Sequence, residues 1–174
     1  MPAVRLSVLT LALSLLASST ALAQSRRVEV RFTPTARAQL AVWIEDAEGV
    51  PVRTLCLFVM KNDPGPRWHR DLRRWYAGDQ MRMLVDDRDL IATVAKPTRN
   101  PGRYKASWDG KDDAGKMAPH GKYTLYIEAA REHGTYQLMK HDFQWGGKPF
   151  QSELKPNVEI GSAKIRYRTS AEKK

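Results

Sequence analysis

Apolar and polar side chains alternate along several short stretches of the chain, and turn residues separate these stretches. Val28, Val30 and Phe32, for example, alternate with charged residues, and Pro34 follows them. A period of two residues is typical of a β-strand with one buried face. The segments that we expect to form strands are residues 28–32, 40–45, 52–60, 102–108, 123–130, 135–143 and 158–167.

About seven short strands with turn signals between them predict an all-β protein, an antiparallel β-sandwich in which two sheets pack face to face. The core of such a sandwich is formed by the apolar faces of both sheets. We expect it to contain Val42, Ile44, Leu125 and Ile127. In the last strand the alternation shifts by one residue across Gly161-Ser162, which predicts a bulge or a kink. We expect residues 169–174 to be frayed.

The segment between residues 108 and 123 is rich in glycine and aspartate. Glycine adopts positive φ values without strain, and aspartate side chains accept hydrogen bonds from nearby amides, so both favour turns. A calcium loop is the other interpretation, but the pattern D-x-[DN]-x-[DN]-G is absent. We expect positive φ at Gly110, Gly115 and Gly121. The predicted structural turn contains Trp108, at least partly buried, with Asp109, Gly110, Asp112, Gly115 and Gly121.

An insertion over residues 62–100 is too long for an ordinary loop of a sandwich, so we look for function there. Its apolar side chains have the spacing of one face of two helical turns, with arginines on the rest. The apolar face consists of Trp68, Leu72, Trp75 and Tyr76, and the arginines are Arg67, Arg70, Arg73 and Arg74.

Two interpretations of this segment stay open. Arginines interleaved with aromatic rings can clamp an anionic ligand or an acidic partner. Alternatively, a short amphipathic helix caps one open end of the sandwich, with its arginines paired to Asp71, Asp79 and Asp86. Loops held by a rigid scaffold commonly carry binding residues, so we place the candidate site here. The candidates are Arg67, Trp68, Arg70, Arg73, Arg74, Trp75 and Tyr76, with Arg131 and His133 on a nearby hairpin.

Few residues suit catalysis or metal binding. Cys56, the only cysteine, lies in an apolar strand-like run, where we expect an inert, buried thiol. The histidines at positions 69, 120, 133 and 141 follow no metal-binding spacing, and no motif pairs a nucleophile with a base. We therefore expect no enzymatic activity, no metal site and no cofactor. The alternative is a metal or ligand carrier that uses His133, His141 and the aspartates.

The first 23 residues have the three parts of a secretory signal peptide. Arg5 precedes an apolar run over residues 6–16, and Ala21-Leu22-Ala23 forms a cleavage site. The run is shorter than the roughly 20 residues of a membrane-spanning helix. We expect cleavage after Ala23, a single domain over residues 24–174 without a transmembrane segment, and a periplasmic location. An exported protein meets little nucleic acid, so we expect no nucleic-acid partner.

The chain carries a net charge of +10, which falls to +9 without the first 23 residues. A basic surface in the cell envelope favours anionic lipids, anionic polymers or an acidic protein. The alternative is solubility with a basic tail, because several basic residues crowd positions 164–174 and no long basic run exists elsewhere.

Four segments resemble the predicted periplasmic family called domain of unknown function 2271, and the resemblance extends over residues 28–167. These segments are residues 41–46, 108–116, 121–123 and 128–134. The turn after Trp108 is also similar to one in the Ig-like domain of the flagellar hook-capping scaffold protein, which implies an Ig-like sandwich. The family resemblance implies a bacterial periplasmic protein with an accessory role in extracytoplasmic flavin or metal redox systems. We expect a binding or scaffold module whose partner is a periplasmic protein or an anionic ligand.

Overall fold

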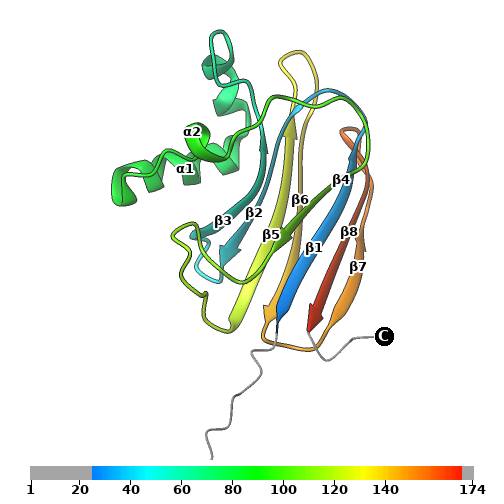
Figure 1. Cartoon of the computed structure of the whole chain (residues 1–174). Helices are drawn as coiled ribbons and strands as arrows, with labels where there is room; N and C mark the ends of the chain where they lie inside the picture. The colour runs from blue at the N-terminus through cyan, green and yellow to red at the C-terminus, as the bar shows by residue number, and fades with distance from the viewer. Residues whose placement is uncertain (1–24, 170–174) are drawn as a thin grey trace, which may run out of the picture.

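The computed structural model describes residues 25–169, which form two antiparallel sheets of four strands each (Figure 1). Sheet A has the strand order β4-β1-β8-β7, and sheet B has the order β3-β2-β5-β6. The strands are β1 (Arg26–Pro34), β2 (Gln39–Asp46), β3 (Pro51–Phe58), β4 (Tyr104–Trp108), β5 (Gly121–Ala130), β6 (Tyr136–Trp145), β7 (Phe150–Leu154) and β8 (Ile160–Thr169). The predicted all-β sandwich is confirmed. The predicted signal peptide and its cleavage after Ala23 lie outside the described residues.

The main core lies between the two sheets. All four residues that the alternation assigns to the core are fully buried: Val42, Ile44, Leu125 and Ile127. Val28, Val30 and Ile165 face them from sheet A and are equally buried. Each such side chain contributes roughly 1.5–3 kcal/mol to stability when it leaves water.

Sheet A differs from the sequence prediction in two places. Strand β7 was not predicted, because an edge strand contacts one neighbouring strand and its residues alternate only between half-buried and exposed. Thr169, expected to be frayed, pairs with Arg26 at the end of β8, and the rest of the predicted tail lies outside the described residues. The predicted irregularity at Gly161 is confirmed, since the pairing of β1 with β8 shifts opposite this residue.

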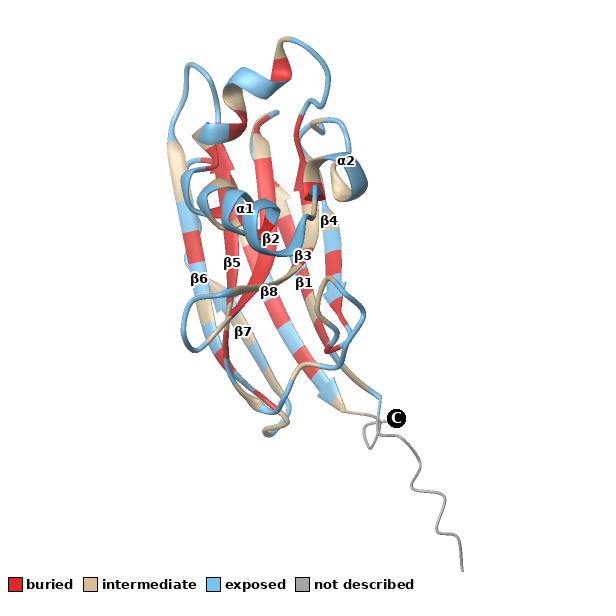
Figure 2. Ribbon diagram, turned by 90° about the vertical axis from the view of Figure 1, so that its left-hand side faces the viewer, coloured by how far each residue is buried: buried red, intermediate tan, exposed pale blue. Residues whose placement is uncertain are grey.

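The central strands of sheet B, β2 and β5, are buried on both faces along most of their length, because the insertion covers their outer surface. In Figure 2 the helices lie in front of β2, β3 and β5. The insertion contains a 3-10 helix, η1 (Gly65–Asp71), and two α-helices, α1 (Arg73–Asp86) and α2 (Leu90–Val94). Trp43 and Tyr126 of the sheet share an apolar cluster with Leu72 and Trp75 of the insertion. The insertion therefore forms a third layer, and the expectation that it caps an open end of the sandwich is wrong.

The expected two-turn helix is also interrupted. Helix η1 ends at Asp71 and α1 begins at Arg73, while Leu72 between them has φ −77° and ψ 73°, outside the helical region. Leu72 is fully buried and anchors this break against sheet B. The break divides the arginine–aromatic segment into two halves, residues 67–71 and residues 73–76, which point to different parts of the molecule.

The glycine- and aspartate-rich turn follows Trp108, which is 1% exposed and lies with its ring centre 4.6 Å from that of Trp145. Gly110 and Gly115 have φ values of 87° and 82°, as predicted. The prediction for Gly121 is wrong: this residue is the first of β5 and is not among the positive-φ glycines. Its pairing with Trp145 of β6 requires extended backbone instead.

Candidate functional site

Residues 73–76 are held against sheet B by two buried glutamates. Arg74 donates from Nε and Nη2 to the two carboxylate oxygens of Glu45, at 3.1 and 2.5 Å. Glu45 also accepts a hydrogen bond from Nε1 of Trp43 at 2.8 Å. The carboxylate of Glu128 accepts hydrogen bonds from the backbone amides of Arg74 and Trp75, both at 2.9 Å. Glu128 therefore caps the N-terminus of α1, where free amides and the helix dipole favour a negative charge.

Burial and hydrogen bonding shift the protonation equilibria of this network. Burial raises the pKa of Glu128, although the amides of Arg74 and Trp75 oppose the shift. The hydrogen bond to Glu45 raises the pKa of Arg74. A buried carboxylate that loses its cationic partner keeps the cost of desolvation without compensation. Arg74 is thus a structural residue. The expectation that the arginines of this segment pair with nearby aspartates is wrong for Arg74, whose partner is Glu45.

The other side chains of residues 73–76 also pack on sheet B. The Arg73 guanidinium lies 4.6 Å from the ring centre of Tyr136. Trp75 is 3% exposed and donates from Nε1 to the hydroxyl of Thr54 at 3.1 Å. Tyr76 is half-buried against the same apolar cluster. Trp75 and Tyr76 therefore offer little free surface to a ligand, and the exposed Arg73 and Arg74 side chains are held by their contacts with sheet B.

Trp68, in contrast, lines an open groove of about 340 Å³ at one end of the sandwich, which we call the Trp68 groove. Its lining includes Arg37, Gln39, Trp68, Thr98, Arg131 and one carboxylate, that of Glu132. Trp68 is half-buried, and the Arg67 guanidinium lies 4.4 Å from its ring centre. Gln39 donates from Nε2 to the carbonyl of Trp68 at 2.8 Å, which fixes the backbone of η1 to β2. Arg70 is exposed and does not line the groove.

Arg131 reaches the Trp68 groove from the tip of the β5–β6 hairpin. Its guanidinium contacts the fully buried carboxylate of Glu159 at 2.9 Å. Thr135 donates to the same carboxylate oxygen at 2.6 Å. These contacts hold Arg131 in place while 38% of its side chain stays exposed. His133, on the same hairpin tip, is 91% exposed and does not line the groove.

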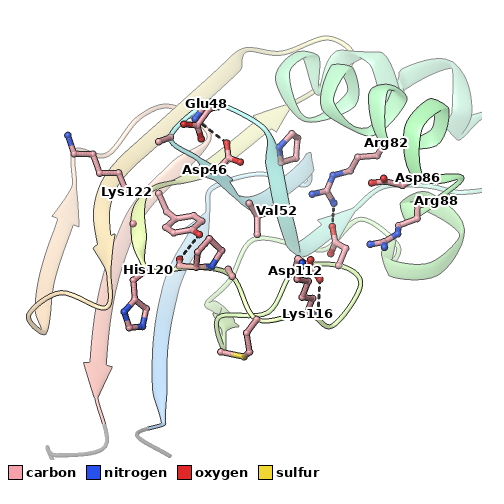
Figure 3. Close-up of a pocket in the computed structure, with 18 residues that line it drawn as sticks. Asp46, Glu48, Val52, Arg82, Asp86, Arg88, Asp112, Lys116, His120 and Lys122 are labelled. Atoms are coloured by element: carbon pink, nitrogen blue, oxygen red, sulfur yellow. Dashed lines mark hydrogen bonds and ion pairs between the residues drawn. The ribbon is translucent and has the colours of Figure 1, made fainter.

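A second hollow, of about 540 Å³, lies between the turn after Trp108, the β2–β3 hairpin and the end of α1 (Figure 3). Carboxylates and cations both line it. Asp46 accepts hydrogen bonds from the amides of Glu48 and Val50, and Asp112 accepts them from the amides of Ala114 and Lys116. The Asp46 and Asp112 carboxylates therefore hold turns together. Asp109 does the same by accepting a hydrogen bond from the amide of Lys111, and this turn role is the one that the sequence predicts for Asp109 and Asp112.

Asp113 links this turn to the insertion, a role that the sequence did not suggest. Its side chain forms an ion pair with Arg82 of α1, marked in Figure 3 by the dashed line from Arg82. It also accepts a hydrogen bond from the amide of Thr54 at 3.2 Å. Arg53 lies 3.6 Å from the same carboxylate. Glu45 and Glu128 were missed as well. Their only signal was an acidic residue within a strongly apolar strand run.

Asp79 is a further buried carboxylate near this ion pair. It lies on the inner face of α1 and is 2% exposed, and neither of its side-chain oxygens has a hydrogen-bond partner among the described residues. Burial, together with the charges of Asp89 and Asp113, raises its pKa to about 6. Asp79 is therefore neutral in mildly acidic solution and charged above about pH 6.

The residues that a metal carrier would use are not brought together. Within residues 25–169, no group of three or more histidine, cysteine, aspartate or glutamate side chains has a geometry that could hold a metal ion. His141 packs against Phe150 on β7, and burial lowers its pKa. Burial raises the pKa of the Cys56 thiol to about 12. Among the same residues, no helix combines the length and apolar character needed to cross a bilayer.

Comparison with known proteins identifies a family. The sequence model described as "Predicted periplasmic protein (DUF2271)" matches residues 26–162, which covers sheet B, the insertion and all of sheet A except most of β8. The chain matches no curated protein and no solved structure, so the likeness to the flagellar Ig-like domain stays a prediction. The chain belongs to the DUF2271 family of predicted periplasmic proteins.

Proposed function

We propose that this protein is a non-enzymatic binding module of the periplasm that holds an acidic segment of a partner protein in the Trp68 groove. The observation that supports this proposal most directly is the meeting of Trp68 with arginines from three separate parts of the chain. Arg67 lies on its ring, and Arg37 and Arg131 line the same groove. Tryptophan and arginine are the residue types that most often dominate binding energy at protein interfaces.

The groove is also built to keep its shape without a ligand. Gln39 holds the backbone at Trp68, and Glu159 holds Arg131. A preformed site loses less conformational entropy on binding than a flexible one. The guanidinium groups offer planar pairs of donors that match carboxylates, so an acidic segment is the complementary partner.

The family resemblance suggests where such a partner is to be sought. It implies proteins of extracytoplasmic flavin or metal redox systems, and we include this accessory role in the proposal. A small anionic ligand in the same groove is the alternative within this class. The two possibilities are distinguished by capturing periplasmic proteins on the immobilised chain, with and without an intact groove. A protein captured only by the intact groove indicates a protein partner rather than a small anionic ligand.

Intrinsic fluorescence offers a direct test, because four of the five tryptophans are at most 3% exposed. These four are Trp43, Trp75, Trp108 and Trp145. Collisional quenching by acrylamide therefore reports mainly on Trp68. We expect a short polyglutamate peptide to reduce this quenching saturably, and the effect to fall as ionic strength rises from about 0.01 to about 0.5 M.

Matched variants assign the effect to the groove. Arg67→Ala and Arg37→Ala remove exposed side chains and should each weaken peptide binding with little change in the unfolding midpoint. Arg27→Ala, on the exposed face of β1 and outside the groove, is the control and should bind as the wild type. Peptide binding that survives both groove substitutions, or that Arg27→Ala weakens equally, would contradict the proposal.

A further inference from the structure

A cleft opens between β3 and β4, which are one edge strand of each sheet. Figure 2 shows α2 beside these two strands. We call it the Cys56 cleft. Its volume of about 500 Å³ is within the range of pockets that hold small molecules. Its lining includes Leu55, Cys56, Phe58, Lys96, Arg99 and Tyr104.

The inner surface of the Cys56 cleft is apolar and continuous with the main core. Leu55, Cys56 and Tyr104 are only partly buried and pack against that core. The ring of Tyr104 meets the ring of Phe58 edge-on, with the ring centres 5.3 Å apart. A hydrocarbon chain in the cleft would cover half-exposed apolar surface and release water from it, which is favourable.

Every charged residue that lines the cleft is a cation: Lys96, Arg99 and Lys105. Lys105 lies 3.8 Å from Glu29 in an exposed pair. Lys96 and Arg99 belong to none of the ion pairs found within residues 25–169. The Trp68 groove and the hollow beside the turn both include carboxylates in their lining, so the Cys56 cleft differs from them in charge.

The backbone holds this cationic rim in position. The amide of Lys96 donates to the carbonyl of Leu57, and the carbonyl of Lys96 accepts from the amide of Val59, both at 2.9 Å. The Arg99 guanidinium lies 5.9 Å from the ring centre of Phe58. The chain is therefore fixed to the edge of β3 while the Lys96 and Arg99 side chains stay exposed.

We propose that the Cys56 cleft binds a single-chain amphiphilic anion, with its hydrocarbon chain between the two sheets and its anionic head beside Lys96 and Arg99. A fatty acid has this chemistry, and so does an anionic phospholipid that inserts one acyl chain. This site is separate from the Trp68 groove, so the inference does not depend on the proposed function.

Cys56 provides the readout, because it is the only cysteine of the chain. The raised pKa of Cys56 makes alkylation slow, so N-ethylmaleimide is used in large excess. The alkylation rate of the intact protein is measured with increasing laurate, kept below the concentration at which laurate forms micelles. We expect saturable protection, with alkylation slowed about tenfold at saturation because the bound chain covers the thiol. An alkylation rate that laurate leaves unchanged would overturn the proposal for a free fatty acid.

Charge-reversal variants locate the anionic head. The pair Lys96→Glu and Arg99→Glu replaces attraction by repulsion and should weaken laurate binding about tenfold or more. The pair Lys140→Glu and Lys148→Glu makes the same change in net charge at exposed positions outside the cleft and should bind laurate as the wild type does. Equal weakening in both pairs would show a general effect of net charge and overturn the assignment of the site.

Three further probes separate the parts of the ligand. Dodecanol has the chain without the charge, and acetate has the charge without the chain, so each should protect Cys56 less than laurate. Equal protection by either would refute an amphiphile site. Phosphatidylglycerol vesicles replace laurate in the last arm, and protection by vesicles alone would identify membrane lipid as the source. Protection by neither laurate nor vesicles would end the proposal.

Discussion

Replacing Gly110 by alanine adds one methyl group at the most confined point of the turn after Trp108. Gly110 has a φ of 87°, and a Cβ atom at this position would lie 2.2 Å from Cζ2 of Trp145. Trp145 is 2% exposed and packs against Trp108, so its ring has little room to move. The substitution therefore combines backbone strain with a steric clash.

Gly115 supplies the matched control, because it shares the backbone conformation without the clash. Its φ is 82°, and no atom lies within 4 Å of the Cβ position apart from those of Gly115 itself and its two chain neighbours. A side chain in the left-handed region costs roughly 1–2 kcal/mol, and we expect this cost in both variants. Overpacking a closed core costs typically about 1–3 kcal/mol more, and this should affect Gly110→Ala alone. The expected loss is thus about 2–5 kcal/mol for Gly110→Ala and about 1–2 kcal/mol for Gly115→Ala.

Urea unfolding of the two variants and the wild type measures the difference. Trp145→Phe, combined with Gly110→Ala, removes the ring atoms that the new methyl group would meet. The double variant should lose less stability than the sum of its single changes, because the clash is relieved. Equal losses in Gly110→Ala and Gly115→Ala, or strictly additive losses in the double variant, would refute the reasoning.

Two further predictions concern the insertion. Arg74→Ala leaves the buried Glu45 carboxylate without its guanidinium and should cost about 1–3 kcal/mol in urea unfolding, a value reduced because the Arg74 side chain is 41% exposed. Arg73→Ala loses the contact with the Tyr136 ring and should cost below about 1 kcal/mol, so equal costs would contradict the assigned roles. Asp79→Asn should gain stability relative to the wild type as pH rises from about 4 to about 6. The raised pKa makes the folded wild type lose stability across this range, and a pH-independent difference would contradict this.

Every strand of the sandwich except β7 could be predicted, because one face of each lies in the main core, whatever covers the other face. Val42 and Ile44, two residues apart on the inner face of β2, are both fully buried, as the period of two residues predicts. The outer face of sheet B could not be predicted in the same way. Glu45 and Glu128 are only 3% and 0% exposed, because α1 lies over them and uses them as hydrogen-bond partners. The unbroken apolar run over residues 40–44 of β2 indicates burial on both faces, but neither this run nor the acidic residues show which segment covers the outer face.

The candidate site was predictable in its residue types but not in its arrangement. The sequence placed Arg131 and His133 near Trp68, and the structure brings Arg131 to the same groove as Trp68 but not His133. The partner of Arg74 was expected among the nearby aspartates, yet it is Glu45 of β2. Contacts between segments distant in the chain depend on strand order and register, and helical spacing within one segment does not contain that information.

The break at Leu72 explains why one run of arginines serves two purposes. After the break, α1 must begin on sheet B, so its free amides and first arginines are used to satisfy Glu128 and Glu45. Before it, η1 lies at the end of the sandwich, where Arg67 and Trp68 keep exposed surface. Substitutions before the break should therefore change binding with little effect on stability, and substitutions after it should change stability first. This separation lets binding at the Trp68 groove be tested on a protein that stays folded.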